Sequence, residues 1–103
     1  MTMTAAIHRS PITGKKWRVE FSDGHTVDFG AAGYQDFTQH GDPARRKAYI
    51  ARHASREHWR DPRTAGFWAR WLLWERPTMR AAAREIHAKF GIQVVVARHM
   101  RVE

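Results

Sequence analysis

The residues best suited to chemistry are arginines in the segment from Pro43 to Glu57. On a helix of about 100° per residue, Arg45, Arg52 and Arg56 lie within roughly 60° of one another, and Tyr49 falls in the same stripe. Arginine presents a planar fork of donors that matches phosphate oxygens, and tyrosine stacks on an exposed base or donates to a phosphate. The pattern predicts a surface that binds the phosphate backbone of nucleic acid.

Further side chains extend this stripe on both sides. Arg46 and His53 flank it on the predicted helix, and Arg60 and Arg63 follow along the chain. The predicted nucleic-acid-binding residues are therefore Arg45, Arg46, Tyr49, Arg52, His53, Arg56, Arg60 and Arg63. No helix-turn-helix, zinc-finger or homeodomain pattern accompanies them, so recognition of particular bases is not predicted.

The competing interpretation is that these arginines form ion pairs within the fold. Glu57, Glu75 and Asp36 are the available acceptors, and they would occupy two of the arginines. The helix itself is expected to dock through the side opposite the stripe, which carries Ile50, Ala51 and Ala54.

The histidines do not have the spacing of a metal site. His53 and His58 are five residues apart, so they do not share a helical face, and there is no His-Glu-x-x-His motif. The minor alternative is that His25, His40 or His53 converge in space on a metal or a phosphate. No metal site and no cofactor are predicted.

Catalytic signatures are also missing from the sequence. The carboxylates that a metal-dependent nuclease would need are scattered, and two of them precede prolines at predicted helix starts. There is no nucleophile elbow, phosphate-binding Gly-rich loop or dinucleotide fingerprint. An enzyme, specifically a metal-dependent nuclease, is the third hypothesis, and no catalytic residue is assigned.

The element that must position these residues is the segment from Thr64 to Glu75, which holds three of the five tryptophans. Its apolar residues surround a helix almost completely, which is typical of a buried helix. Each aromatic side chain removes on the order of 150–250 Å² from water. The predicted core residues are Trp17, Phe21, Phe67, Trp68, Trp71, Leu72, Trp74, Ile86 and Phe90.

Strands are predicted at both ends of the sequence. From Lys15 the apolar and polar residues alternate, Asp23-Gly24 favours a tight turn with both residues at positive φ, and residues 25–29 return as a second strand. A third strand, from Ile92 to Ala97, is expected to join this hairpin. Residues 1–14 are expected to form a flexible leader, and residues 15–103 a single domain.

Three helices are predicted between the strands, over residues 43–57, 62–75 and 77–90. Asp42-Pro43 and Asp61-Pro62 each place a capping carboxylate before a proline, Pro77 starts the third helix with Thr78 as an alternative cap, and Gly91 ends it. In the long connection from Gly30 to Gly41, Tyr34 and Phe37 are expected to fold onto the core. The fold class is α+β: an N-terminal β-hairpin and a C-terminal strand form a small sheet, packed against three helices with the tryptophan-rich one at the centre.

The net charge of +8 is unevenly distributed, because residues 42–103 carry fourteen basic and six acidic side chains. Such a surface attracts polyanions, nucleic acid being the commonest. There is no cysteine, no secretory signal pattern and no apolar run of the roughly twenty residues that a membrane span needs. The protein is expected to be neither secreted nor transmembrane, and to reside inside a cell or a virion.

Several segments together resemble a known family. They are Phe29-Gly-x-x-Gly-Tyr-x-Asp-Phe-Thr-x-His40, the run from Arg46 to His53, and Ala65-Gly-Phe-Trp-x-Arg-Trp-Leu-Leu-Trp74. The sequence from Lys15 to Phe90 is similar to a family of small uncharacterised proteins of large double-stranded DNA viruses, of the phycodnavirus and mimivirus kind. The resemblance implies a viral setting and no particular activity or cofactor.

The leading functional hypothesis is a non-enzymatic protein that binds nucleic acid, most simply DNA, through its phosphates, as an accessory or virion-associated protein of a DNA virus or phage. The alternative is a minor capsid or other interaction protein whose basic surface meets acidic protein partners. Neither a membrane nor a small-molecule substrate is expected as a partner.

Overall fold

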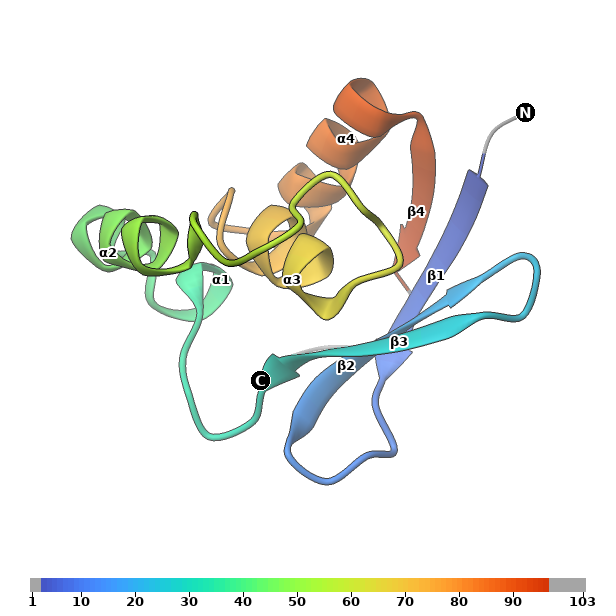
Figure 1. Ribbon diagram of the computed structural model, residues 1–103, viewed down its shortest axis with the longest axis horizontal. Coiled ribbons are helices and arrows are strands. Elements are labelled where there is room, and N and C mark those ends of the chain that lie inside the picture. Colours follow the sequence, from blue (N-terminus) through green and yellow to red (C-terminus); the bar gives the residue numbers. More distant parts are fainter. Residues whose placement is uncertain (1–2, 97–103) are drawn as a thin grey trace.

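The computed structural model describes residues 3–96, which form a four-stranded sheet with helices over one face (Figure 1). The strands are β1 (Met3–Arg9), β2 (Lys15–Phe21), β3 (Thr26–Ala31) and β4 (Ile92–Val96), in the order β3-β2-β1-β4. The helices are α1 (Phe37–His40), α2 (Pro43–His53), α3 (Ala65–Trp68) and α4 (Met79–Phe90), and α3 continues into a π-helical turn, η1 (Ala69–Leu73). The predicted α+β class is confirmed.

The predicted hairpin is present as β2 and β3. Trp17 pairs with Phe29 and Val19 with Val27, so their side chains share the face that the helices cover. At the turn, Gly24 has a φ of 90°, whereas Asp23 does not have the positive φ that the dipeptide pattern predicted. The alternation of apolar and polar residues therefore predicted these two strands and their buried face correctly.

The expectation of a flexible leader over residues 1–14 is wrong for Met3–Arg9. This segment is strand β1, which pairs antiparallel with β2 and parallel with β4. Ala5 and Ile7 are 0% and 1% exposed, and both belong to the core. As a result β4 is joined to the sheet through β1 and not through the hairpin, and Ala97 lies outside the described residues.

The helices begin directly after a capping Asp or Thr, and of the three prolines predicted to start a helix only Pro43 does so. Asp42 caps α2 as predicted, by accepting from the Ala44 N–H. The next helix starts at Ala65 with Thr64 as its cap, so the predicted start at Asp61-Pro62 is wrong, and α4 uses the alternative cap Thr78. Gly91 ends α4 in the left-handed conformation, with a φ of 69°. The helix α2 ends at His53, four residues before the predicted end.

The core lies between the sheet and the tryptophan segment. Phe67, Trp68 and Leu72 are fully buried, and Phe21 and Phe29 meet the Trp68 ring at centroid distances of 6.1 Å. Three of the predicted core residues, Trp71, Trp74 and Phe90, are only partly buried and pack against this cluster, while Trp17, Phe21 and Ile86 belong to its buried part.

The connection from Gly30 to Gly41 has an ordered second half. Asp36 caps the short helix α1 in a capping box with Gln39, and Lys16 donates to the Asp36 carboxylate at 2.8 Å. Phe37 is buried as expected, but Tyr34 is 75% exposed, so the prediction that it folds onto the core is wrong. Within residues 3–96, none of the helices has the length and apolar character needed to cross a bilayer.

Candidate functional site

An open cleft with a volume of about 460 Å³ lies beside α2, and we call it the α2 cleft. One wall is a side of α2 that includes Arg45, Ala48 and Arg52. A second group of lining residues comes from the loop between Gly30 and Asp36, and a third group, which we call the floor, comes from α3, η1 and Trp74. The cleft therefore collects three segments that are far apart in the sequence.

Two of the predicted arginines lie on this cleft. Arg45 and Arg52 are exposed, and within residues 3–96 neither forms an ion pair or hydrogen bond with a carboxylate. Lys15, at the start of β2, lines the same cleft and forms no ion pair or hydrogen bond with a carboxylate in this part of the chain, although it is near enough to Asp28 to help lower the pKa of that carboxyl. The cleft consequently has unneutralised positive charge at its edge.

Arg56 and Arg60 lie outside the cleft, in the segment that joins α2 to α3. Both are exposed, and neither has a carboxylate partner among the described residues. Because α2 ends at His53, Arg56 does not continue the helical stripe of Arg45 and Arg52. The predicted single stripe of three arginines is therefore wrong in its geometry, although all three side chains remain accessible.

Arg46 and Arg63 are held by carboxylates of the fold, so the prediction that they contact nucleic acid is not supported by their positions. The Arg46 guanidinium donates to the Glu75 carboxylate at 2.7 Å. Arg63 donates to Asp23 at 2.7 Å and lies over the Phe21 ring, 4.6 Å from its centroid. The Arg46 pair is part of the fold, whereas the Arg63–Asp23 pair is exposed at the surface.

Tyr49 is only 8% exposed and cannot stack on a base as the sequence predicted. Its ring is stacked on Trp74, with a centroid distance of 4.3 Å and an interplanar angle of 1°, and on His53 at 4.3 Å and 26°. Ala51 and Ala54, expected to dock the helix, are exposed and Ile50 is half-buried. The helix docks through Tyr49 instead, on the side that the sequence assigned to the ligand.

The Tyr49 hydroxyl nevertheless remains available to a ligand. Tyr49 lines the α2 cleft, and no hydrogen bond joins its hydroxyl to another group in residues 3–96. Burial, and secondly the nearby Glu57 carboxylate, raise the pKa of Tyr49 to about 12. The hydroxyl is therefore protonated at neutral pH and can donate a hydrogen bond.

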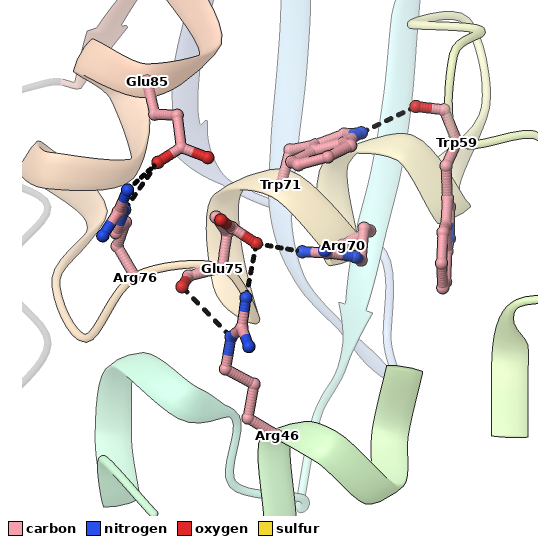
Figure 2. A network of polar contacts seen from close by, with 7 residues as sticks. All are labelled: Arg46, Trp59, Arg70, Trp71, Glu75, Arg76 and Glu85. Atoms are coloured by element: carbon pink, nitrogen blue, oxygen red, sulfur yellow. Dashed lines mark hydrogen bonds and ion pairs between the residues drawn. The ribbon is translucent and has the colours of Figure 1, made fainter. Parts of the chain in front are cut away.

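The position of α2 is fixed by a network centred on Glu75 (Figure 2). Arg70 donates to the Glu75 carboxylate at 2.5 Å, Arg46 donates to the same oxygen, and the Arg46 Nε–H also donates to the Glu75 carbonyl at 3.2 Å. Burial alone would raise the pKa of Glu75, but hydrogen bonds, foremost that from Arg70, outweigh it and lower the pKa to about 2. The carboxylate thus holds two arginines, one from α2 and one from η1.

The π-helical turn η1 contributes to both the network and the cleft. Arg70, which is 9% exposed, lies over the Trp71 ring at 4.3 Å and the Trp59 ring at 5.2 Å. The Trp71 indole N–H donates to the Trp59 carbonyl at 2.6 Å, as Figure 2 shows. On its other side η1 presents Ala69 and Leu73 to the cleft. Such π turns occur frequently at functional sites.

Glu57 is the acidic residue of the cleft that is not used by a lysine or arginine. Its carboxylate lies 3.5 Å from His53 Nδ1 and covers the backbone of Gly66 so closely that a Cβ there would overlap it. At the other side of the cleft, Asp36 is paired with Lys16. The cleft therefore has cations at its edge and one carboxylate, that of Glu57, whose ion-pair partner among residues 3–96 is a histidine.

No group of three or more His, Asp or Glu side chains in residues 3–96 is arranged to hold a metal ion. The three histidines considered for convergence have separate surroundings: His25 lies near Phe21, His40 near Trp74 and His53 against Tyr49. Burial lowers the pKa of His40. His25 is exposed and His53 is half-buried, and the three rings do not converge on one site.

Several lining residues were not predicted from the sequence. Lys15, Ala48, Glu57 and Trp74 line the cleft together with the predicted Arg45, Tyr49, Arg52 and His53. A sequence signal for the cleft is Gly66, which stands within a predicted helix. Glycine is unfavourable there unless another group approaches its backbone, as Glu57 does.

A comparison with known protein families gives a match over part of the chain. Residues 5–53 are similar to a family described as "Family of unknown function (DUF5754)". No curated protein and no solved structure matches the chain. The matched residues run from β1 to the end of α2 and include the α2 and loop walls of the cleft, but not its floor.

Proposed function

We propose that the protein binds nucleic acid, and that Lys15, Arg45 and Arg52 at the α2 cleft contact its phosphates. Arg56 and Arg60 extend the contact beyond the cleft. The observation that carries the proposal is the state of Arg45 and Arg52, which are exposed on one side of α2 without a carboxylate partner in the described part of the chain.

The position of these unpaired arginines supports the proposal. Some arginines of the fold are neutralised, such as Arg18 by Asp28 and Arg76 by Glu85, whereas Arg80 and Arg84 on α4 are, like Arg45 and Arg52, without a carboxylate partner in residues 3–96. Arg45 and Arg52 differ from that pair in lining a cleft. Arg45 and Arg52 are seven residues apart, which corresponds to about 10 Å along the helix. Two guanidinium groups at this separation repel each other in the free protein, and a polyphosphate chain that spans them removes the repulsion.

The biological setting is part of the same proposal. The sequence resemblance to small proteins of large DNA viruses, described above, favours an accessory or virion-associated protein of a DNA virus or phage. The proposed role is non-enzymatic and depends on phosphate contacts, so the affinity is largely independent of base sequence.

A gel-shift titration over a range of salt concentrations tests the proposal. The Arg45→Glu/Arg52→Glu double variant is compared with Arg80→Glu/Arg84→Glu, which makes the same change in net charge at exposed positions of α4 away from the cleft. We expect the first variant to lose at least tenfold in affinity and the second to retain most of it. For three contacted phosphates, log affinity falls against log salt with a slope of roughly −2 on a single strand.

Two results would overturn the proposal. Equal losses in the two double variants would mean that net charge alone drives association. No binding by the natural sequence at physiological salt, together with co-fractionation with a large protein assembly, would favour the alternative, a minor capsid or interaction protein with acidic partners.

A further inference from the structure

We infer that the α2 cleft accepts one unpaired nucleotide of a single strand, with the base inside the cleft and the adjoining phosphates on Arg45 and Arg52. This inference rests on the proposed function and specifies the form of nucleic acid that the site takes. It goes beyond phosphate contacts because it depends on groups below the cationic edge of the cleft.

The size and lining of the cleft fit a flat aromatic ring. Its volume of about 460 Å³ lies within the range of roughly 300–1,000 Å³ found for small-ligand sites. Ala48 and Ala69 leave space where larger side chains would fill it, and Leu73 and Trp74 provide apolar surface. A base that is paired and stacked in a duplex cannot enter such a cleft unless it leaves the stack.

Two polar groups in the cleft can hydrogen-bond to the edge of a base. The Tyr49 hydroxyl belongs to a side chain that is 8% exposed, and it has no hydrogen-bond partner among the described residues. It can donate to a ring nitrogen or a carbonyl oxygen. The Glu57 carboxylate accepts from an amino group or a ring N–H but repels a phosphate. Glu57 therefore favours an orientation in which the base, and not the phosphate, approaches it.

Tyr34 supplies a stacking surface from a segment outside α2. It lines the cleft from the Gly30–Asp36 loop, is 75% exposed, and follows Gly33, whose φ is 89°. Unlike the Tyr49 ring, it is not part of a ring stack within residues 3–96. Stacking of a base on an aromatic side chain is a common way to hold a single strand.

The experiment measures fluorescence anisotropy with three probes: a labelled single strand about 12 nucleotides long, the corresponding duplex, and adenosine monophosphate as a competitor. The test variant is Ala48→Trp, which fills the cleft. The matched control is Ala51→Trp, because Ala51 is also exposed on α2 but does not line the cleft. A second test variant is Tyr34→Ala, which removes an exposed ring at no cost to the core.

We expect the natural sequence to bind the single strand at least tenfold more tightly than the duplex. Ala48→Trp should reduce single-strand affinity by roughly tenfold or more, Tyr34→Ala by roughly 5- to 100-fold, and Ala51→Trp by little. Adenosine monophosphate should compete only weakly, because it carries one phosphate group and contacts fewer cations.

The inference is overturned if the duplex binds as tightly as the single strand, or if Ala48→Trp and Ala51→Trp behave alike. It is also overturned if the mononucleotide binds as tightly as the strand, which would make a free nucleotide the ligand. The proposed function survives the first two of these results as long as the Arg45→Glu/Arg52→Glu variant loses binding, whereas a free nucleotide as the ligand, or no binding to any probe, removes both.

Discussion

Arg45 and Arg46 are adjacent in the sequence and have opposite surroundings. Arg45 is exposed at the α2 cleft and has no carboxylate partner within residues 3–96, whereas Arg46 points to the other side and is held by Glu75. One residue on a helix is a rotation of about 100°, which is enough to move a side chain from the exposed edge of the cleft to an internal ion pair. Residue type alone therefore does not distinguish an exposed, unpaired arginine from one that is paired within the fold.

The α2 cleft and the network around Glu75 also differ in how their charges are balanced. Around Glu75, one carboxylate serves both Arg46 and Arg70, and aromatic rings cover Arg70. At the cleft, Lys15, Arg45 and Arg52 have no such partner among the described residues. The first region should accordingly determine stability, and the second should determine ligand affinity.

The largest effect is expected for Glu75→Ala. The substitution leaves Arg70 buried without its acceptor and releases Arg46, and breaking a buried ion pair in this way costs about 3–5 kcal/mol of unfolding free energy. Urea denaturation measures it. Glu20→Ala is the control, because its pair with His8 is exposed and should contribute about 0–1 kcal/mol. Similar losses in both variants would contradict the distinction between the regions.

The second prediction concerns acid unfolding. The pKa of Glu75 is lowered from 4.5 to about 2 in the folded protein, so folding favours the ionised carboxylate. Its contribution to stability is complete above pH 4.5 and is lost as the pH falls towards 2. The unfolding free energy should therefore decrease over this interval, and the decrease should be smaller in Glu75→Gln. An unchanged slope in that variant would show that other carboxylates govern acid stability.

The third prediction compares the adjacent arginines directly. Arg46→Ala removes hydrogen bonds to the Glu75 side chain and carbonyl and should cost about 1–2 kcal/mol of unfolding free energy. Arg45→Ala should change stability by no more than about 0.5 kcal/mol, yet reduce the slope of log affinity against log salt by roughly 1. Denaturation and salt titration of both variants provide the measurement. The comparison fails if Arg45→Ala is the more destabilising of the two.

The smallest effect on stability is expected for Tyr49→Phe. The ring stack with Trp74 and His53 is retained, and the hydroxyl has no internal partner among the described residues, so unfolding free energy should change by no more than about 0.5 kcal/mol. Single-strand affinity should fall by a few-fold, about the effect of one hydrogen bond. A marked loss of stability with unchanged affinity would place this hydroxyl among the structural groups.

Local patterns in the sequence predicted those elements that are stabilised by neighbouring residues. The hairpin β2–β3 follows from alternation and Gly24, and the ends of α2 and α4 marked by Asp42 and Gly91 follow from capping. Strand β1 was missed because Ala5 and Ile7 form only a weak apolar pattern, and its place in the sheet depends on β4, almost ninety residues away.

The candidate site was only partly predictable for the same reason. Arg45 and Arg52 could be recognised from their spacing, but the side of α2 that docks could not, because it depends on Trp74 stacking on Tyr49. The pairing of Arg46 depends on Glu75, which the sequence offered as one acceptor among several. The π-helical turn η1 has no simple sequence signal, although it sets the directions of Ala69 and Leu73 towards the cleft.

The parallel pairing of β1 with β4 has a consequence for biosynthesis. Met3 pairs with Ile92 and Ile7 with Val96, so β1 receives its second neighbour only after β4 has emerged from the ribosome. Until then β1 is an open edge of a three-stranded sheet, and unpaired edges are prone to wrong associations. Pairing over such a sequence distance also slows folding. Completion of this sheet therefore waits for the synthesis of β4, and nascent chains halted before residue 92 should be sensitive to proteases.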